Sequence, residues 1–149
     1  LVDPVGVTSA EWLPGLHAAA LAHLAAADPA AHATLAAHDP AALAEPDPVA
    51  HGAYAAAFFP AWFVDRSLVP LLPFPTPAEA SATGAAVAAR LRREGYDWSD
   101  RLRDLGVPTL VVHGAGDLLP AAMAARTAAH LGSAELVALP DVGHMPFWE

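Results

Sequence analysis

The sequence predicts an α/β fold in which a parallel sheet is interrupted by a long helical insertion. Toward its end the chain runs through an apolar stretch at 107–112, a helical stretch at about 120–131 and a second apolar stretch at about 134–139. Strands that alternate with helices in this way form parallel sheets. The residues before this unit are rich in alanine and divided by Asp-Pro pairs, which is typical of short helices.

The first elements follow from local signals. Leu1-Val2 followed by "DPVG" predicts the end of a strand that runs into a turn. Thr8 and Glu11 fit a capping box that opens a helix as far as about Ala27. Asp28-Pro29 and Asp39-Pro40 each place an acidic N-cap before a proline at the first helical position, which predicts helices at 29–37 and 40–44.

A further helix is expected at 49–59, followed by an aromatic cluster of Phe58, Phe59, Trp62 and Phe63. Four prolines within 66–77 predict an extended connector without regular structure. Thr76 and Glu79 form a second possible capping box, and the helix that it opens should end at Gly95. A short helical turn is expected at 99–105.

These elements divide the chain into three parts. Residues 1–7 are the end of a core strand, 8–105 are a helical insertion with its connector, and 106–149 continue the α/β layer. A sheet with so few strands would leave its edges and one face uncovered. We therefore expect the sequence to be a piece of a longer protein, cut at both ends.

Composition excludes several classes of function. Seven basic against 16 acidic residues give a formal charge of −9, which repels phosphate backbones and anionic membranes. The chain has no cysteine, so thiolate metal sites and thiol nucleophiles are excluded. No stretch is apolar enough to span a bilayer and no signal-like segment opens the sequence. We expect a cytoplasmic protein with no nucleic-acid or membrane partner.

Two polar residues lie just beyond the predicted strands. Asp117 stands in the Gly-rich turn "HGAGDLLP" after the first strand, and His144 stands in "DVGHMPFWE" after the second. In doubly wound folds ligands gather beyond the carboxyl ends of the strands, and a right-handed crossover brings neighbouring ends together. An imidazole that acts as a general base needs a carboxylate to fix its tautomer. Asp117 and His144 are therefore the candidate catalytic pair.

The segment "DLGVPTLVVHGAGDLLP…AAHLGSAELVALPDVGHMPFWE" resembles the C-terminal part of the α/β-hydrolase fold, near the proline iminopeptidase-like serine hydrolases. In that family an "HG..D" turn carries the acid of the catalytic triad and a "GH" turn carries the histidine. The resemblance implies that Asp117 is the acid, His144 the histidine, and 8–105 the helical cap. It also implies an ester, an amide or a short peptide as substrate.

The sequence departs from the family pattern in that the nucleophile elbow, the oxyanion-hole loop and the final helix expected after "PFWE" are all absent from it. The nucleophile of this fold lies in a G-x-S-x-G elbow that precedes the acid and the histidine, and no such elbow occurs here. We expect it in a missing N-terminal half of the same protein, so this chain alone should be inactive. Two alternatives stay open: an enzyme of the same fold with an aspartate nucleophile, as in dehalogenases and epoxide hydrolases, and a non-catalytic binding module.

The other polar candidates have simpler interpretations. His113 is expected to support the loop of Asp117, and Asp141 is a rival acid that we expect to be solvated. We expect no metal site and no cofactor. No i, i+4 pair and no nearby acid at metal-ligand spacing is expected to make a site of the histidines of the insertion, which are His17, His23, His32, His38 and His51. The aromatic cluster can line a substrate pocket or form the core of the insertion. Solvated helix faces are expected for the arginines, which are Arg90, Arg92, Arg93, Arg101 and Arg103.

Overall fold

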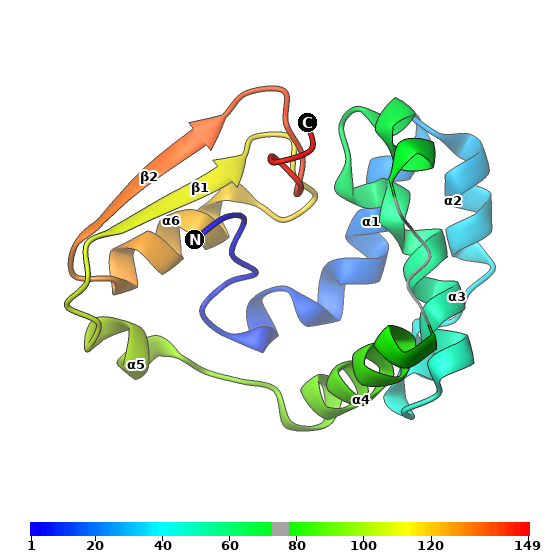
Figure 1. Cartoon of the computed structure of the whole chain (residues 1–149), viewed down its shortest axis with the longest axis horizontal. Coiled ribbons are helices and arrows are strands. Elements are labelled where there is room, and N and C mark those ends of the chain that lie inside the picture. Colours follow the sequence, from blue (N-terminus) through cyan, green and yellow to red (C-terminus); the bar gives the residue numbers. More distant parts are fainter. Residues whose placement is uncertain (73–77) are drawn as a thin grey trace.

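The computed structural model describes residues 1–72 and 78–149 and shows a mixed α/β structure with a parallel sheet (Figure 1). Strand β1 (Thr109–Gly114) pairs in parallel with β2 (Ala134–Leu139), and α6 (Ala121–His130) connects them. Strand β2 has the bounds that the sequence predicts. Strand β1 begins two residues later than predicted, because Thr109, after Pro108, is the first residue whose N–H can join the sheet.

The first residues lie along the free edge of β1 (Figure 1). Val2 forms a parallel bridge with Val112, whose N–H donates to the carbonyl of Leu1 and whose carbonyl accepts from the N–H of Asp3. The chain thus places three strand ends, at Asp3, Gly114 and Leu139, at one edge of the sheet.

Helix α6 covers one face of this sheet. Val111, Ala124 and Leu131 are buried between the helix and the strands. Leu110, which alternates with Val111 along β1, points to the opposite face and is exposed. The sequence predicted an uncovered face, and Leu110 is on it.

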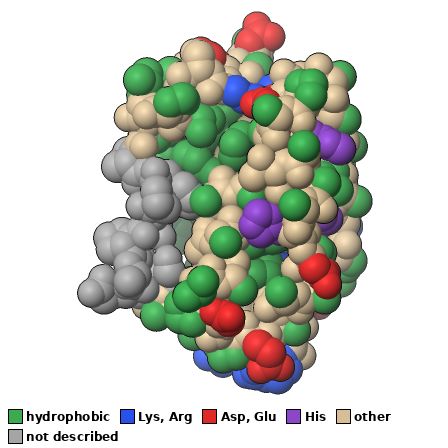
Figure 2. All heavy atoms as spheres, turned by 90° about the vertical axis from the view of Figure 1, so that its right-hand side faces the viewer, with side chains coloured by type: hydrophobic (Ala, Val, Ile, Leu, Met, Phe, Trp, Pro, Cys, Tyr) green, Lys and Arg blue, Asp and Glu red, His purple; other side chains and the backbone are tan. Residues whose placement is uncertain are grey.

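The segment between the first residues and β1 is mainly helical in its described part, with one isolated antiparallel bridge between Thr8 and Asp97. Its α-helices and 3-10 helices are η1 (Ser9–Glu11), η2 (Leu13–Gly15), α1 (Leu16–Ala25), α2 (Pro29–Ala36), η3 (Pro40–Ala44), α3 (Pro48–Phe58), η4 (Phe59–Trp62), η5 (Arg66–Leu71), α4 (Ala78–Glu94) and α5 (Ser99–Arg103). Figure 2 shows the outer face of this helical segment, where apolar side chains lie among scattered histidines and carboxylates. None of the helices in the described part of the chain has the length and apolar character needed to cross a membrane.

The first predicted helix was wrong over its first half. Residues 9–15 form two 3-10 turns, and the α-helix starts only at Leu16, because Pro14 and Gly15 interrupt the chain before it. Thr8 makes no capping hydrogen bond. Glu11 instead accepts from the N–H of Val7 and pairs with Arg126 on α6, so this carboxylate ties the start of the insertion to the sheet layer.

The Asp-Pro helix starts are confirmed. The carboxylate of Asp28 accepts from the N–H of Ala31, and that of Asp39 accepts from the N–H of Ala41. Asp47 uses the same arrangement before Pro48 to open α3, a third instance that the sequence analysis missed. Proline fixes φ at the first helical position while the carboxylate accepts from a backbone donor that the helix leaves unpaired.

The predicted connector at 66–77 was wrong over its first half, where Arg66–Leu71 form the 3-10 helix η5. Asp65 caps it by accepting from the N–H and the hydroxyl of Ser67. Residues 73–77, and with them the predicted capping box of Thr76 and Glu79, lie outside the described residues. Gly95 follows α4 at a φ of 61°, the left-handed conformation that ends a helix.

One buried core joins the helical segment to the sheet layer. The residues that follow Asp117, namely Leu118, Leu119 and Met123, are buried together with side chains from α1, α2, η3, α3 and η4. The loop that leaves β1 is therefore held from both sides: its backbone by the sheet and its apolar side chains by the helices.

Candidate active site

Asp117 is fixed in the turn between β1 and α6. Its N–H donates to the carbonyl of Gly114 at 3.1 Å, and its Oδ1 accepts from the N–H of Leu119 at 3.0 Å. The side chain is fully buried. One oxygen of the carboxylate thus forms the turn, as a structural aspartate would, and Oδ2 is left for another donor.

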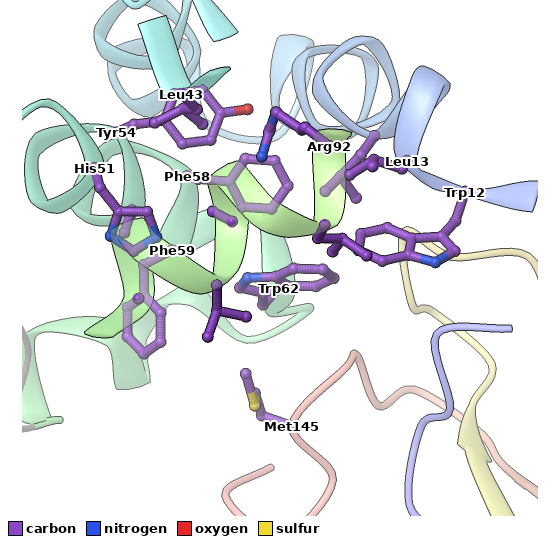
Figure 3. Close-up of a pocket in the computed structure, with 16 residues that line it drawn as sticks. Trp12, Leu13, Leu43, His51, Tyr54, Phe58, Phe59, Trp62, Arg92 and Met145 are labelled. Atoms are coloured by element: carbon purple, nitrogen blue, oxygen red, sulfur yellow. The ribbon is translucent and has the colours of Figure 1, made fainter. Parts of the chain in front are cut away.

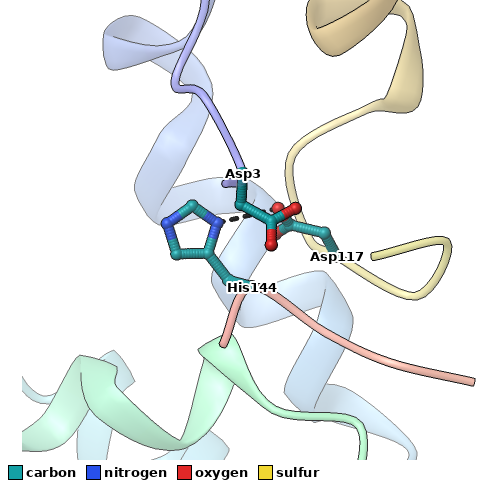
Figure 4. A group of neighbouring side chains, drawn as sticks. All are labelled: Asp3, Asp117 and His144. Carbon is teal, nitrogen blue, oxygen red and sulfur yellow. Dashed lines mark hydrogen bonds and ion pairs between the residues drawn. The ribbon is translucent and has the colours of Figure 1, made fainter. Parts of the chain in front are cut away.

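That donor is His144. Its Nδ1 lies 2.8 Å from Oδ2 of Asp117 (Figure 4), as the sequence analysis expected. The imidazole also stacks on Trp62, with ring centroids 4.1 Å apart, and the backbone N–H of His144 donates to the carbonyl of Trp62. The side chain is 13% exposed. The ring is therefore held in place but still reaches the surface.

The two loops are joined by their backbones. Ala115 donates to the carbonyl of Leu139 at 2.8 Å, and Gly116 donates to that of Val142 at 2.9 Å. A side chain at Gly114 would overlap the carbonyl groups of Val142 and Gly143. The close approach of the loops therefore requires glycine at 114.

The carboxylate of Glu149 holds the histidine loop against the helical segment. Its Oε1 accepts from the N–H groups of Val64 and Asp65, each at 2.8 Å, and its Oε2 accepts from Gly143 at 2.6 Å. An ionised acceptor strengthens each of these hydrogen bonds. Glu149 thereby fixes Trp62 and His144 relative to each other.

A hydrogen bond from Nδ1 to a carboxylate determines which nitrogen is free. With the proton on Nδ1, the neutral imidazole presents Nε2 as a base, and the buried carboxylate stabilises the imidazolium that forms when Nε2 takes a proton. In the described part of the chain, no serine or threonine hydroxyl is hydrogen-bonded to His144. The pair is thus equipped for general acid–base chemistry on a group that these residues do not supply.

The sequence analysis missed Asp3. Its buried carboxylate accepts from the N–H of Gly114 at 2.8 Å and lies 2.9 Å from Nδ1 of His113. His113 is itself buried, and its Nδ1 lies 3.9 Å from Asp117. The signal was present, because Asp3 follows a predicted strand just as Asp117 does. The strand at Leu1-Val2 is so short that its end was not among the strand ends expected to carry polar site residues.

Burial raises the pKa of the Asp3 carboxyl, and the nearby Asp117 carboxylate raises it further, while the hydrogen bond from Gly114 opposes both effects. The folded protein therefore holds this proton to higher pH than the unfolded chain does. The stabilising contribution is complete below the ordinary pKa of aspartate and is lost as the pH rises through the raised pKa.

Replacement of Asp3 by asparagine is expected to remove this loss. The amide oxygen still accepts from Gly114, but the side chain no longer ionises. The free energy of unfolding of Asp3→Asn relative to the parent should therefore rise between about pH 4 and pH 7. Urea unfolding at several pH values measures the difference, and a difference that stays constant or falls over this range would contradict the argument.

Other predicted residues lie apart from the pair. Asp141 is exposed at a φ of 56°, and His144 bonds to Asp117 instead of to this rival acid. Single ligand atoms of Asp3, Asp117 and His144 all lie within 4.8 Å of one another, a spacing that could hold a metal ion. However, the nearest atoms of Asp117 and His144 already bond to each other, so their hydrogen bond would have to break first.

A cavity of about 500 Å³ opens in the helical segment (Figure 3), and its wall includes Trp62, the side chain on which His144 stacks. Trp62 and Met145 form the side nearest the histidine loop. The rest of the wall comes mainly from α3 and α4, with contributions from η3, η4 and the residues up to the first of α1. The aromatic cluster both contributes to the core of the insertion and lines the cavity, since Phe58 and Phe59 are buried and are also lining residues. Arg92 lines it too, contrary to the expectation of a solvated face.

No family model matches the chain. One curated protein is similar to it, the proline iminopeptidase of Lactobacillus delbrueckii subsp. lactis, at 40% identity over 53 residues. The match covers 36% of this chain and 18% of that protein, so the chain spans well under two thirds of its relative.

Proposed function

We propose that this chain provides the acid and the histidine of a serine-type α/β-hydrolase that cleaves an ester or an amide. Asp117 would orient His144, and residues 8–105 would form the helical cap over the site. The observation that carries the proposal is the 2.8 Å contact between Oδ2 of Asp117 and Nδ1 of His144. The contact joins two loops that follow adjacent parallel strands, where open α/β sheets bind their ligands.

The proposed chemistry uses the free Nε2 of His144. A serine hydroxyl, supplied by sequence upstream of this chain in the order typical of the fold, would attack the carbonyl carbon while Nε2 takes its proton. The imidazolium would then give that proton to the departing alcohol or amine and leave an acyl-enzyme. A water molecule, activated by the same nitrogen, would release the acid and restore the serine.

Burial of Asp117 supports this assignment of roles. A fully buried carboxylate that accepts hydrogen bonds from both Leu119 and His144 stabilises the imidazolium without competition from water. Stacking on Trp62 limits rotation of the imidazole, so Nε2 is held in one direction. The buried carboxylate and the stacking contact both favour a general base whose Nε2 stays in one position through successive proton transfers.

The test compares two polypeptides, this chain alone and the chain preceded by its upstream coding sequence. p-Nitrophenyl acetate should be hydrolysed only by the longer protein, and His144→Gln should reduce its rate to near background. The chain alone should not exceed free imidazole. Substantial His144-dependent turnover by the chain alone would contradict an external nucleophile. Absence of turnover by a folded longer protein would favour a binding module, and turnover of epoxides or haloalkanes instead of esters would favour an aspartate nucleophile.

A further inference from the structure

We propose that the cavity lined by Trp62, Arg92 and Met145 binds an apolar molecule that carries a carboxylate or a similar anion, with the anion at Arg92. The proposal deepens and rests on the proposed function through Trp62, which lines the cavity and stacks on His144, but the binding itself does not depend on catalysis. The proposed ligands are anionic and therefore differ from peptides with a free α-amino group, which carry a positive charge at that end.

The walls of the cavity are predominantly apolar. In the described part of the chain they are formed by Trp12, Leu13, Leu16, Leu43, His51, Tyr54, Ala55, Phe58, Phe59, Trp62, Gly84, Val87, Ala88, Leu91, Arg92 and Met145. A volume of about 500 Å³ lies within the range of small-molecule sites, in which a few polar groups set the orientation of an otherwise apolar ligand. The chemistry of the ligand should therefore follow from the few polar groups.

Two of those polar groups already have partners. The hydroxyl of Tyr54 lies 3.0 Å from Nδ1 of His17, and Nε1 of Trp12 donates to the hydroxyl of Tyr96 at 2.8 Å. These contacts hold the two aromatic rings in the wall of the cavity. They also occupy the polar ends of the two side chains, so Tyr54 and Trp12 offer a ligand mainly apolar surface.

The groups that remain favour an anion. Arg92 is half-buried and has no ion pair with any described carboxylate, and Figure 3 shows it reaching toward Phe58 and Tyr54. The Nδ1 of His51 is buried and has no hydrogen-bond partner in the described residues. Burial lowers the pKa of His51 and the nearby Arg92 cation lowers it further, so the imidazole is neutral at pH 7 and can donate one N–H to a ligand.

An ammonium group is disfavoured by the same arrangement. No aspartate or glutamate is among the described lining residues, so an amine would lose its hydration without gaining a partner, close to the charge of Arg92. A preference for an anion over a cation would be significant in a protein whose net charge is −9. The overall field of the protein attracts cations, so a preference for an anion has to come from the cavity itself.

Three probes of one shape test the proposal: 4-phenylbutyrate, 4-phenylbutylamine and 4-phenylbutanol, titrated calorimetrically into the 149-residue chain. The carboxylate should bind at least tenfold more tightly than the amine, with the alcohol between them. Arg92→Met, which keeps the apolar stem, should weaken 4-phenylbutyrate at least tenfold and leave 4-phenylbutanol within twofold. Arg101→Met on α5 removes the same charge away from the cavity and should change neither.

Ala88→Trp should fill the cavity and abolish binding of all three probes, with folding checked by circular dichroism. Equal or tighter binding of the amine would overturn the proposal, and so would equal effects of Arg92→Met and Arg101→Met or no binding of any probe. His144→Gln, which should abolish hydrolysis, should leave binding of 4-phenylbutyrate within twofold. Probe binding therefore tests the proposed ligand class, and ester hydrolysis separately tests the proposed hydrolase function.

Discussion

Asp117→Asn is expected to lower turnover of p-nitrophenyl acetate by about three to four orders of magnitude in the protein that includes the upstream sequence. The amide keeps the size of the side chain and can still accept from Leu119. It can also present its NH₂ group to Nδ1 of His144, which would place the imidazole proton on Nε2, the nitrogen that has to act as the base. Steady-state kinetics measure the loss, which should fall mainly in kcat.

Asp141→Asn is the matched control. It makes the same chemical change three residues before His144, and asparagine tolerates the positive φ at this position. Its side chain is exposed and has no hydrogen bond to His144. Turnover should stay within about twofold of the parent, whereas a comparable loss in both variants would show that the acid had been wrongly assigned.

Gly114→Ala is expected to destabilise the protein by about 2–4 kcal/mol, near the upper end of the cost of overpacking. The new Cβ would overlap the carbonyls of Val142 and Gly143, which are backbone atoms and cannot rotate away. The loops could separate to relieve the clash, but that movement would pull His144 from Asp117. Urea unfolding measures the destabilisation.

Gly132→Ala is the control for this variant. Gly132 lies in the turn before β2, and no atom lies within 4 Å of the position that a Cβ would take. Its substitution should change the free energy of unfolding by less than about 0.5 kcal/mol. Gly114→Ala with a stability equal to that of Gly132→Ala would mean that the loops are not in close contact.

The sequence predicts the part of the fold that rests on strong local patterns. The apolar runs, the Asp-Pro starts and Gly95 each determine the conformation of a few residues, and β2, α2 and α4 end within about one residue of the expected positions. The contact between Asp117 and His144 was predictable for a different reason. Parallel strands bring their carboxyl ends to one edge whatever the intervening sequence.

The features that were missed depend on packing. Arg90 and Arg93 pair with Glu94 at the surface, whereas Arg92 lines the cavity. Arg92 follows Gly84 and Ala88 at four-residue spacing, so it lies on the face of α4 that lines the cavity, and packing of the other helices is needed to show that a cavity lies there. The failed helix start at Thr8 has a partly similar cause. Glu11 accepts from Val7 and pairs with Arg126 on α6 instead of completing a capping box with Thr8, and Pro14 and Gly15 delay the α-helix to Leu16.

The most direct test of the central claim is the protonation state of His144 at neutral pH, measured by ¹⁵N NMR. An Asp117–His144 pair that provides a general base requires the proton on Nδ1, a downfield proton resonance from that N–H, and an unprotonated Nε2. Both signatures should disappear in Asp117→Asn and persist in Asp141→Asn. A His144 that carries its proton on Nε2, or whose resonances are unchanged by Asp117→Asn, would contradict the account.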